Sequence, residues 1–292
     1  MYTHDFTRGA RLSRPVRPMT LEEVREVAPS AFAVQAHESR SDRYAYIPTL
    51  DVLRGMEDAG FLPFKATQSK ARDITKREYT KHMIRFRASD QTQALAVGDS
   101  LPEIVLVNSH DGSSAYHLMA GIFRLVCSNG LVIAESMIGA VHIRHSGDVV
   151  RDVIRASREL IADTPGALER IGQWSQLQLT SGEREAFAGS AHTLRFADAE
   201  GQTHTPITPT QLLMPRREAD RKADLWSTLN VIQENTIKGG LHAVGRDQQG
   251  RRRRTTSRAV NGIDQDVKLN RALWQLAERM AELKGAQAVA AA

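Results

Sequence analysis

The chain has 292 residues, of which 41% are hydrophobic and 25% charged, with 39 Lys and Arg, 34 Asp and Glu and a single cysteine. Such a composition is typical of a globular protein large enough to bury a core without disulfides or a metal. One cysteine excludes a disulfide framework and multi-cysteine metal sites, and no run approaches the ~18 apolar residues of a membrane span. We therefore expect a cytoplasmic protein with no membrane partner.

The first half of the chain begins with a polar arm, residues 1–44. Within it Thr20 and Glu23 indicate a capped short helix at 21–27. A second amphipathic helix follows Thr49, its expected cap, and Gly60 ends it. Residues 45–147 are predicted to form the sheet core. After this helix the hydrophobic pattern changes to a period of two, which predicts a mainly antiparallel sheet with strands at 62–72, 79–88, 103–109, 115–127 and 138–145.

The second half, residues 148–284, has helical periodicity. Helices are expected at 148–162, 165–179, 183–195, 209–214, 218–238 and 264–284. The Gly-, Arg- and Gln-rich residues 240–262 are predicted to form a loop, and residues 285–292 a frayed tail. The sequence thus predicts an α+β fold, in which an N-terminal antiparallel sheet packed on helices precedes a mostly helical C-terminal half.

The last predicted helix has an apolar seam of two heptads, formed by Leu269, Leu273, Leu276, Met280 and Leu283. A free coiled coil needs about three or four heptads, so docking of this seam on the protein itself is favoured. A homo-oligomer contact through the seam stays open.

Positive charge is concentrated in two segments. Residues 246–258 hold six Arg against one Asp, and residues 65–87 hold eight Lys and Arg against two acidic residues. Because side chains alternate along a strand, Lys81, Arg85 and Arg87 should share one face of the sheet. The opposite face of that strand is apolar. This pattern indicates a sheet with one buried face and one open cationic face, which suits a phosphate backbone.

Together these two segments favour nucleic-acid binding, while for residues 246–258 alone a solvated, mobile loop is an equally open interpretation. The expected contact residues are Lys65, Lys70, Arg72, Lys81, Arg85 and Arg87 on the sheet, with Arg251, Arg252, Arg253 and Arg254 as a flexible clamp. Aromatic residues make up only 5% of the chain, so backbone contacts should outweigh base stacking. Sequence-tolerant binding, with single-stranded DNA as the favoured partner, is the predicted function.

A metal-dependent nuclease is the first alternative. Potential ligands and bases gather on the predicted sheet and its turns: His110, Asp111, His117, His142 and His145. His110 and Asp111 could activate water on a metal. Their spacing matches no zinc or hydrolase motif, so Asp111 is expected to hold the turn instead. The sequence contains no Gly-rich phosphate-binding loop, no dinucleotide-binding fingerprint and no Gly-x-Ser-x-Gly nucleophile motif. We therefore assign no catalytic or metal-binding residue and no cofactor, and favour a non-enzymatic role.

Two further readings concern polar segments. The run Gln233-Glu-Asn235 beside Gly239-Gly240 could form a polar site, but a helix end that faces solvent is favoured. The basic segments could also bind an acidic protein, as in a non-catalytic interaction protein such as a host-defence antagonist.

Ten strings of the sequence together resemble a known family. They are Tyr46-Ile-Pro-Thr49, Gly60-Phe61 with Gln68 and Arg72, Lys81-His82 with Ile84-Arg85-Phe86-Arg87, Asn108-Ser-His-Asp-Gly-Ser-Ser-Ala-Tyr116, Gly121-Ile-Phe-Arg-Leu-Val-Cys-Ser-Asn-Gly130, Pro215-Arg-Arg217, Asp224-Leu-Trp226 with Asn230, Gln233-Glu-Asn235, Gly239-Gly240 and Lys268-Leu-Asn-Arg-Ala-Leu-Trp274. They resemble the phage- and plasmid-associated family catalogued as domain of unknown function 932. That resemblance implies a mobile-element context in bacteria and no defined activity.

The layout of the first half is similar to that of a second group. A helix, then Gly60-Phe61, then a basic antiparallel hairpin resembles the helix-plus-curved-sheet core of phage single-strand annealing proteins of the RecT and Red-beta type. This resemblance implies DNA handling in the recombination or maintenance of a plasmid or phage.

Overall fold

The computed structural model describes residues 17–40, 46–71, 73–92, 100–124, 130–132, 140–143, 148–246 and 249–290. Its first elements are α1 (Leu21–Val27), the 3-10 helix η1 (Pro29–Phe32) and α2 (Thr49–Asp58). Thr20 and Glu23 form the predicted capping box at the start of α1. Among the described residues, no helix is long and apolar enough to cross a membrane.

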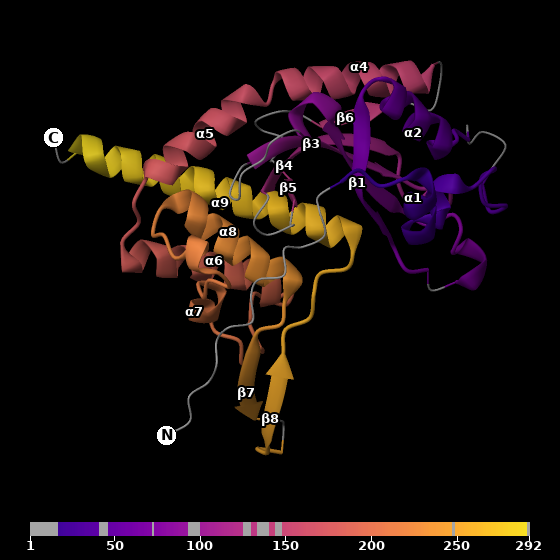
Figure 1. The fold of residues 1–292 in the computed structure, drawn as a ribbon. Helices are drawn as coiled ribbons and strands as arrows, with labels where there is room; N and C mark the ends of the chain where they lie inside the picture. The colour runs from indigo at the N-terminus through magenta and orange to yellow at the C-terminus, as the bar shows by residue number, and fades with distance from the viewer. Residues whose placement is uncertain are drawn as a thin grey trace, which may run out of the picture.

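An antiparallel sheet forms the centre of the first half (Figure 1). It consists of β1 (Phe61–Gln68), β2 (His82–Ala88), β3 (Ser100–Asn108), β4 (Tyr116–Arg124), β5 (Gly130–Val132) and β6 (Ala140–Ile143). The first four strands pair in chain order, and β5 and β6 both pair with β4. The chain reverses between β3 and β4 at Gly112, whose φ of 77° favours glycine. Two short 3-10 helices, η2 (Ile74–Lys76) and η3 (Ser89–Thr92), lie before and after β2.

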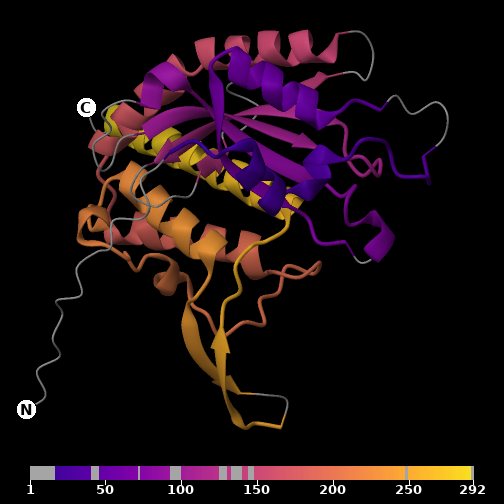
Figure 2. The ribbon, with the colours of Figure 1, turned by 45° about the vertical axis from the view of Figure 1, so that its right-hand side comes forward.

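Helices cover both faces of this sheet (Figure 1, Figure 2). On one face, Ile84 and Phe86 of β2 belong to the main core together with Leu53 of α2 and Val153 of α4 (Val149–Ala162). On the other face, Met83 of β2 belongs to a smaller cluster with side chains of β3, β4 and α9 (Ile263–Ala290). The alternation along β2 therefore separates two covered faces.

The second half of the chain is mostly helical, which confirms the predicted α+β class. Its remaining helices are α5 (Pro165–Gln176), α6 (Ser181–Phe196), α7 (Pro209–Leu212), η4 (Glu218–Asp220) and α8 (Leu225–Lys238). The helix predicted at 218–238 is two elements, because the Asp224 carboxylate accepts a hydrogen bond from the Ser227 amide at 2.7 Å and begins α8 there.

The seam on α9 docks on the protein, as favoured. Leu269 and Leu273 are buried, and Leu276 and Met280 are partly buried against the main core. Leu283, near the end of the helix, is 63% exposed and takes no part in this docking.

Residues 240–262 are not the predicted loop. They contain a two-stranded antiparallel ribbon, β7 (His242–Arg246) and β8 (Arg252–Thr256), which projects away from the helices in both ribbon views (Figure 1, Figure 2). We call residues 242–256 the arm. The many arginines of the arm are typical of a solvated loop. A two-stranded ribbon forms nevertheless, because hydrogen bonds between the strands pair the backbone N–H and C=O groups whatever the side chains are.

Candidate nucleic-acid interface

The predicted cationic face of the sheet is closed at two of its arginines. Arg85 and Arg87 are 1% and 3% exposed, and both contact Glu103 of β3, which is 0% exposed. The Glu103 carboxylate accepts from Arg85 Nη1 at 2.9 Å and from Arg87 Nε at 2.8 Å. The prediction that Arg85 and Arg87 are open to solvent is therefore wrong. Helix α9 covers this face, and Glu103 supplies the countercharge that makes burial of two cations tolerable.

Aromatic rings complete the surroundings of Arg87. Its guanidinium carbon lies 4.2 Å from the ring centroid of Phe64 and 3.5 Å from that of Phe123. Burial lowers the pKa of Arg87, while Glu103 acts in the opposite direction. Such a cation, stacked between rings and paired with a carboxylate, holds the sheet together.

The other predicted contact residues of the sheet differ in exposure and pairing. Lys81 donates to both carboxylate oxygens of Asp264, at 2.7 and 2.8 Å, and its side chain is 13% exposed. Lys65 and Lys70 are exposed. Arg72 lies outside the described residues.

The run Gln233-Glu-Asn235 is buried, so the favoured prediction that it faces solvent is wrong. The Glu234 carboxylate accepts from Arg217 Nη2 at 2.6 Å and from Lys238 Nζ at 2.7 Å. Asn235 Oδ1 accepts from Arg216 Nε at 2.8 Å, and Arg216 also donates to the carbonyl of Gly239. The string Pro215-Arg-Arg217 was the available signal, since two arginines upstream can neutralise and bind polar groups inside a helix.

A buried cluster of polar side chains surrounds Thr49. Its hydroxyl lies 3.1 Å from His82 Nε2, His110 Nε2, the Tyr116 hydroxyl and Asn108 Nδ2. All five residues are 0% exposed. Burial lowers the pKa of His82 to about 3, and His110 contributes to the shift. Thr49 is the first residue of α2 and not the predicted cap, because its hydroxyl points into this cluster.

This cluster gives no support to the nuclease alternative. His110 points inward, whereas the Asp111 carboxylate accepts from the Ser113 amide at 2.9 Å and holds the turn, as favoured. The described residues contain no group of three or more His, Cys, Asp or Glu that could hold a metal. His145 and the side chain of His142 lie outside the described residues.

The arm presents most of its arginines on one face. Residues opposite each other in an antiparallel pair project to the same side, and the register pairs Arg246 with Arg252 and Val244 with Arg254. All four residues are exposed. Together with His242 and Thr256 they form the outer face of the arm. Arg253 pairs with Gly245 and projects to the opposite, inner face.

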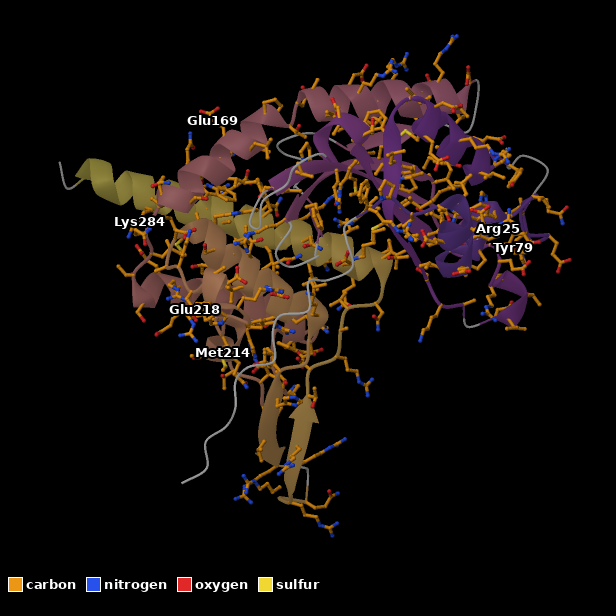
Figure 3. All side chains as sticks on the ribbon, viewed as in Figure 1. Arg25, Tyr79, Glu169, Met214, Glu218 and Lys284 are labelled. Atoms are coloured by element: carbon orange, nitrogen blue, oxygen red, sulfur yellow. The ribbon has the colours of Figure 1, made fainter. Side chains whose placement is uncertain are left out.

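The inner face lies against the protein at Gly245, while Arg253 on the same face is exposed. A side chain at Gly245 would place its Cβ 3.0 Å from Pro206, so the chain passes close beside the arm there. The outer face stays open. Within the part of the chain that the structure describes, Arg252, Arg253 and Arg254 form no ion pair. Figure 3 shows nitrogen-tipped side chains around the end of the arm.

The base of the arm is fixed to the helices. Gln211 of α7 donates to the carbonyl of His242 at 2.7 Å, and Arg195 of α6 donates to the carbonyl of Arg258 at 3.0 Å. At Gly239, φ is 62°, and a Cβ would lie 2.6 Å from backbone atoms of Ser257 and Arg258, which follow β8. These contacts set the direction in which the arm leaves the body.

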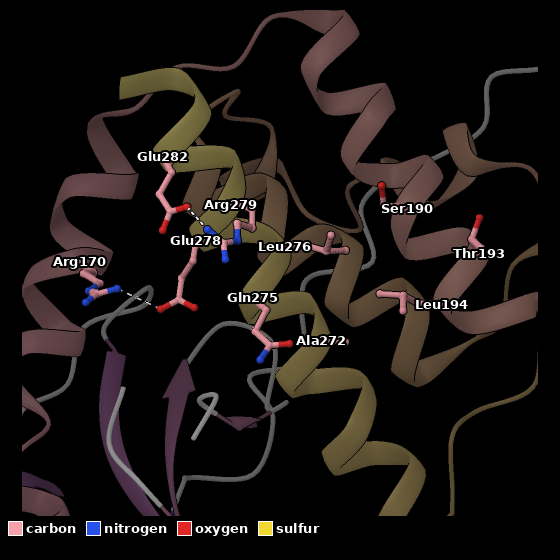
Figure 4. A pocket seen from close by; sticks show the side chains of 10 residues that line it. All are labelled: Arg170, Ser190, Thr193, Leu194, Ala272, Gln275, Leu276, Glu278, Arg279 and Glu282. Carbon is pink, nitrogen blue, oxygen red and sulfur yellow. Dashed lines mark hydrogen bonds and ion pairs between the residues drawn. The ribbon is translucent and has the colours of Figure 1, made fainter. Parts of the chain in front are cut away.

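A groove of about 920 Å³ lies between α5, α6 and α9 (Figure 4). It is less suited than the outer face of the arm to bind a polyanion. Its arginines are paired with carboxylates on its own wall: Arg170 with Glu278 at 3.0 Å and Arg279 with Glu282 at 2.6 Å. Among the predicted contact residues, the structure thus brings Arg252 and Arg254 together on an open surface, and sequence reasoning missed Arg246 beside them.

Comparison with known proteins finds a family and close relatives. The family described as "Domain of unknown function (DUF932)" matches residues 36–274. The chain is similar to two proteins of Escherichia coli (strain K12), "UPF0380 protein YfjQ" and "UPF0380 protein YafZ". Each is 47% identical over 272 residues, which span 93% of this chain and 95% of the relative. No solved structure matches the chain.

Proposed function

The chain belongs to the family described as domain of unknown function DUF932, and because that description names no activity, we propose from the arm that the protein binds nucleic acid with little dependence on sequence. The observation that carries this proposal is the outer face, on which Arg246, Arg252 and Arg254 are exposed along a projecting ribbon. Arginines in this arrangement can attract and contact phosphates whatever the base sequence.

The fixed base strengthens this proposal. A mobile loop loses conformational entropy when it binds, whereas strand pairing and the contacts with Gln211 and Arg195 leave the ribbon fewer conformations for binding to restrict. We therefore expect the arm to contribute more to affinity than the sheet residues. Arg85 and Arg87 contribute nothing by direct contact, because Glu103 and the covering helix hide them.

We place this binding in the recombination or maintenance of plasmid or phage DNA, as the resemblance in the sequence implies, with the protein acting as a binding protein and not as an enzyme. The layout resemblance to single-strand annealing proteins stays a prediction.

The test measures binding of the full-length protein to labelled DNA by fluorescence anisotropy at several salt concentrations. Replacing Arg252 and Arg254 by Ala should lower affinity for every sequence tried. It should also flatten the slope of log affinity against log salt by about 1.4 to 1.8, since each phosphate contact contributes about 0.7 to 0.9.

The matched control removes the same charge elsewhere. Arg155 of α4 and Arg279 of α9 are exposed and paired with carboxylates, and their replacement by Ala should leave the slope nearly unchanged. If both double variants weaken binding equally, net charge and not the arm governs binding. If the unaltered protein binds no DNA but retains an acidic protein partner, the interaction-protein alternative replaces this proposal.

A further inference from the structure

We infer that the arm recognises duplex B-form DNA by laying its outer face in the major groove, an inference that rests on the proposed function. The outer face is one side of a two-stranded ribbon, with Arg246, Arg252 and Arg254 around Val244. The major groove, about 12 Å wide, admits a two-stranded ribbon, whereas the minor groove, about 6 Å wide, is too narrow to do so without distortion.

The composition of the arm disfavours a single strand. Proteins that bind single strands without sequence preference combine a cationic groove with aromatic side chains on which bases stack. Residues 242–256 contain no Phe, Tyr or Trp. The preference for single-stranded DNA rested on an open cationic sheet and on the layout resemblance to single-strand annealing proteins, and the sheet face is covered at Arg85 and Arg87.

The placement of the ribbon agrees with groove entry. The inner face lies against Pro206 at Gly245, although Arg253 on that face is exposed. The outer face carries three exposed arginines, Arg246, Arg252 and Arg254, and is therefore the more cationic of the two. Charge also flanks an apolar centre. Val244 is 48% exposed between cationic neighbours, and an apolar side chain in this position can contact thymine methyl groups, which lie in the major groove.

Neighbouring arginines of the run project to different faces of the arm, and this difference provides a test. Arg252 and Arg253 are adjacent and equally charged, but they project to opposite faces. Groove entry predicts that Arg252→Ala weakens duplex binding several-fold more than Arg253→Ala. A purely electrostatic attraction to a polyanion predicts equal losses.

The experiment compares four probes of one sequence, about two helical turns long, with the full-length protein. They are the DNA duplex, one of its single strands, the matching RNA duplex, and a DNA duplex whose 5-hydroxymethylcytosines carry glucose. The RNA duplex keeps the phosphates but has a deep, narrow major groove that side chains cannot read. The glucose groups keep the DNA backbone and fill the major groove.

We expect the plain DNA duplex to bind about tenfold or more tightly than the other three probes, which corresponds to about 1.4 kcal/mol. Equal affinity for all probes, or a preference for the single strand, overturns groove recognition but leaves the proposed function standing. So do equal losses for Arg252→Ala and Arg253→Ala. Failure to bind any of the probes overturns the proposed function and this inference with it.

Discussion

Replacing Glu103 by Gln tests whether the sheet face is closed. The substitution keeps the size of the side chain and removes the negative charge that accepts hydrogen bonds from Arg85 at 2.9 Å and from Arg87 at 2.8 Å. Both guanidinium groups are then buried without a countercharge from this position. Breaking a buried ion pair by removing one partner costs about 3 to 5 kcal/mol.

That loss is large for this molecule. Native domains are stable by about 5 to 15 kcal/mol, so the variant should lose a substantial part of the free energy of unfolding. At about 2 °C per kcal/mol for a chain of this size, the midpoint of thermal unfolding should fall by roughly 6 to 10 °C. Urea denaturation followed by circular dichroism measures the free energy change directly.

The same substitution at a surface ion pair is the control. Glu282 is 61% exposed beside Arg279, and Glu282→Gln should change the free energy of unfolding by less than about 1 kcal/mol. Combining Glu103→Gln with Arg85→Met should recover part of the loss, because one of the two buried cations is then removed. If Glu103→Gln lowers the free energy of unfolding as little as Glu282→Gln does, the two arginines are not enclosed, and the open cationic face expected from the sequence is correct.

Three further predictions concern the polar cluster and the base of the arm. Because burial lowers the pKa of His82 from 6.5 to about 3, the unfolded chain binds more protons than the folded chain between these pH values, and the free energy of unfolding should fall by about 1.4 kcal/mol per pH unit on acidification across that range. In urea denaturation at several pH values, the free energy of unfolding of His82→Gln should depend less on pH. Thr49→Val should lower the free energy of unfolding, measured by urea denaturation, by about 2 to 3 kcal/mol, because several buried polar groups lose the hydroxyl that they share as a hydrogen-bond partner. The same change at exposed Thr193 should lower it by under about 1 kcal/mol, and similar losses at both positions would contradict the role of the cluster. Gly239→Ala places a Cβ 2.6 Å from the backbone at the base of the arm and should weaken DNA binding in anisotropy assays. Gly240 also has a positive φ, of 78°, but open space around its Cβ, so Gly240→Ala carries the same kind of backbone strain without the close approach and should weaken binding less; equal effects would mean that the close approach at Gly239 is unimportant for binding.

Local patterns in the sequence determined the elements and the fold class. The Thr20 and Glu23 capping box, the turn at Gly112 and the alternation along β2 each involve residues only a few positions apart, so the chain specifies them before any tertiary contact forms. For the same reason, the helical seam at Leu269 and Leu273 identified a docking face on α9 correctly.

The tertiary structure alone decided which charged residues reach solvent. Alternation placed Arg85 and Arg87 on one face of β2, but whether that face is open depends on a carboxylate on the neighbouring strand and on a helix far along the chain. The ion pair between Lys81 and Asp264 joins positions 183 residues apart, a separation that no local period reports. The buried run at Gln233 likewise depends on a distant partner, Asn270.

The candidate site divides in the same way. Composition identified Arg251 to Arg254 as a cationic segment, because charge is visible residue by residue. Pairing with β7, the register that brings Arg246 and Arg252 together, and the fixed base at Gly239 are properties of backbone hydrogen bonds and close approach, which side-chain composition does not encode. The sequence by itself therefore determined where the charge is along the chain. The tertiary structure decided that Arg246, Arg252 and Arg254 lie on one exposed face of a paired ribbon, while Arg85 and Arg87 of the sheet are covered.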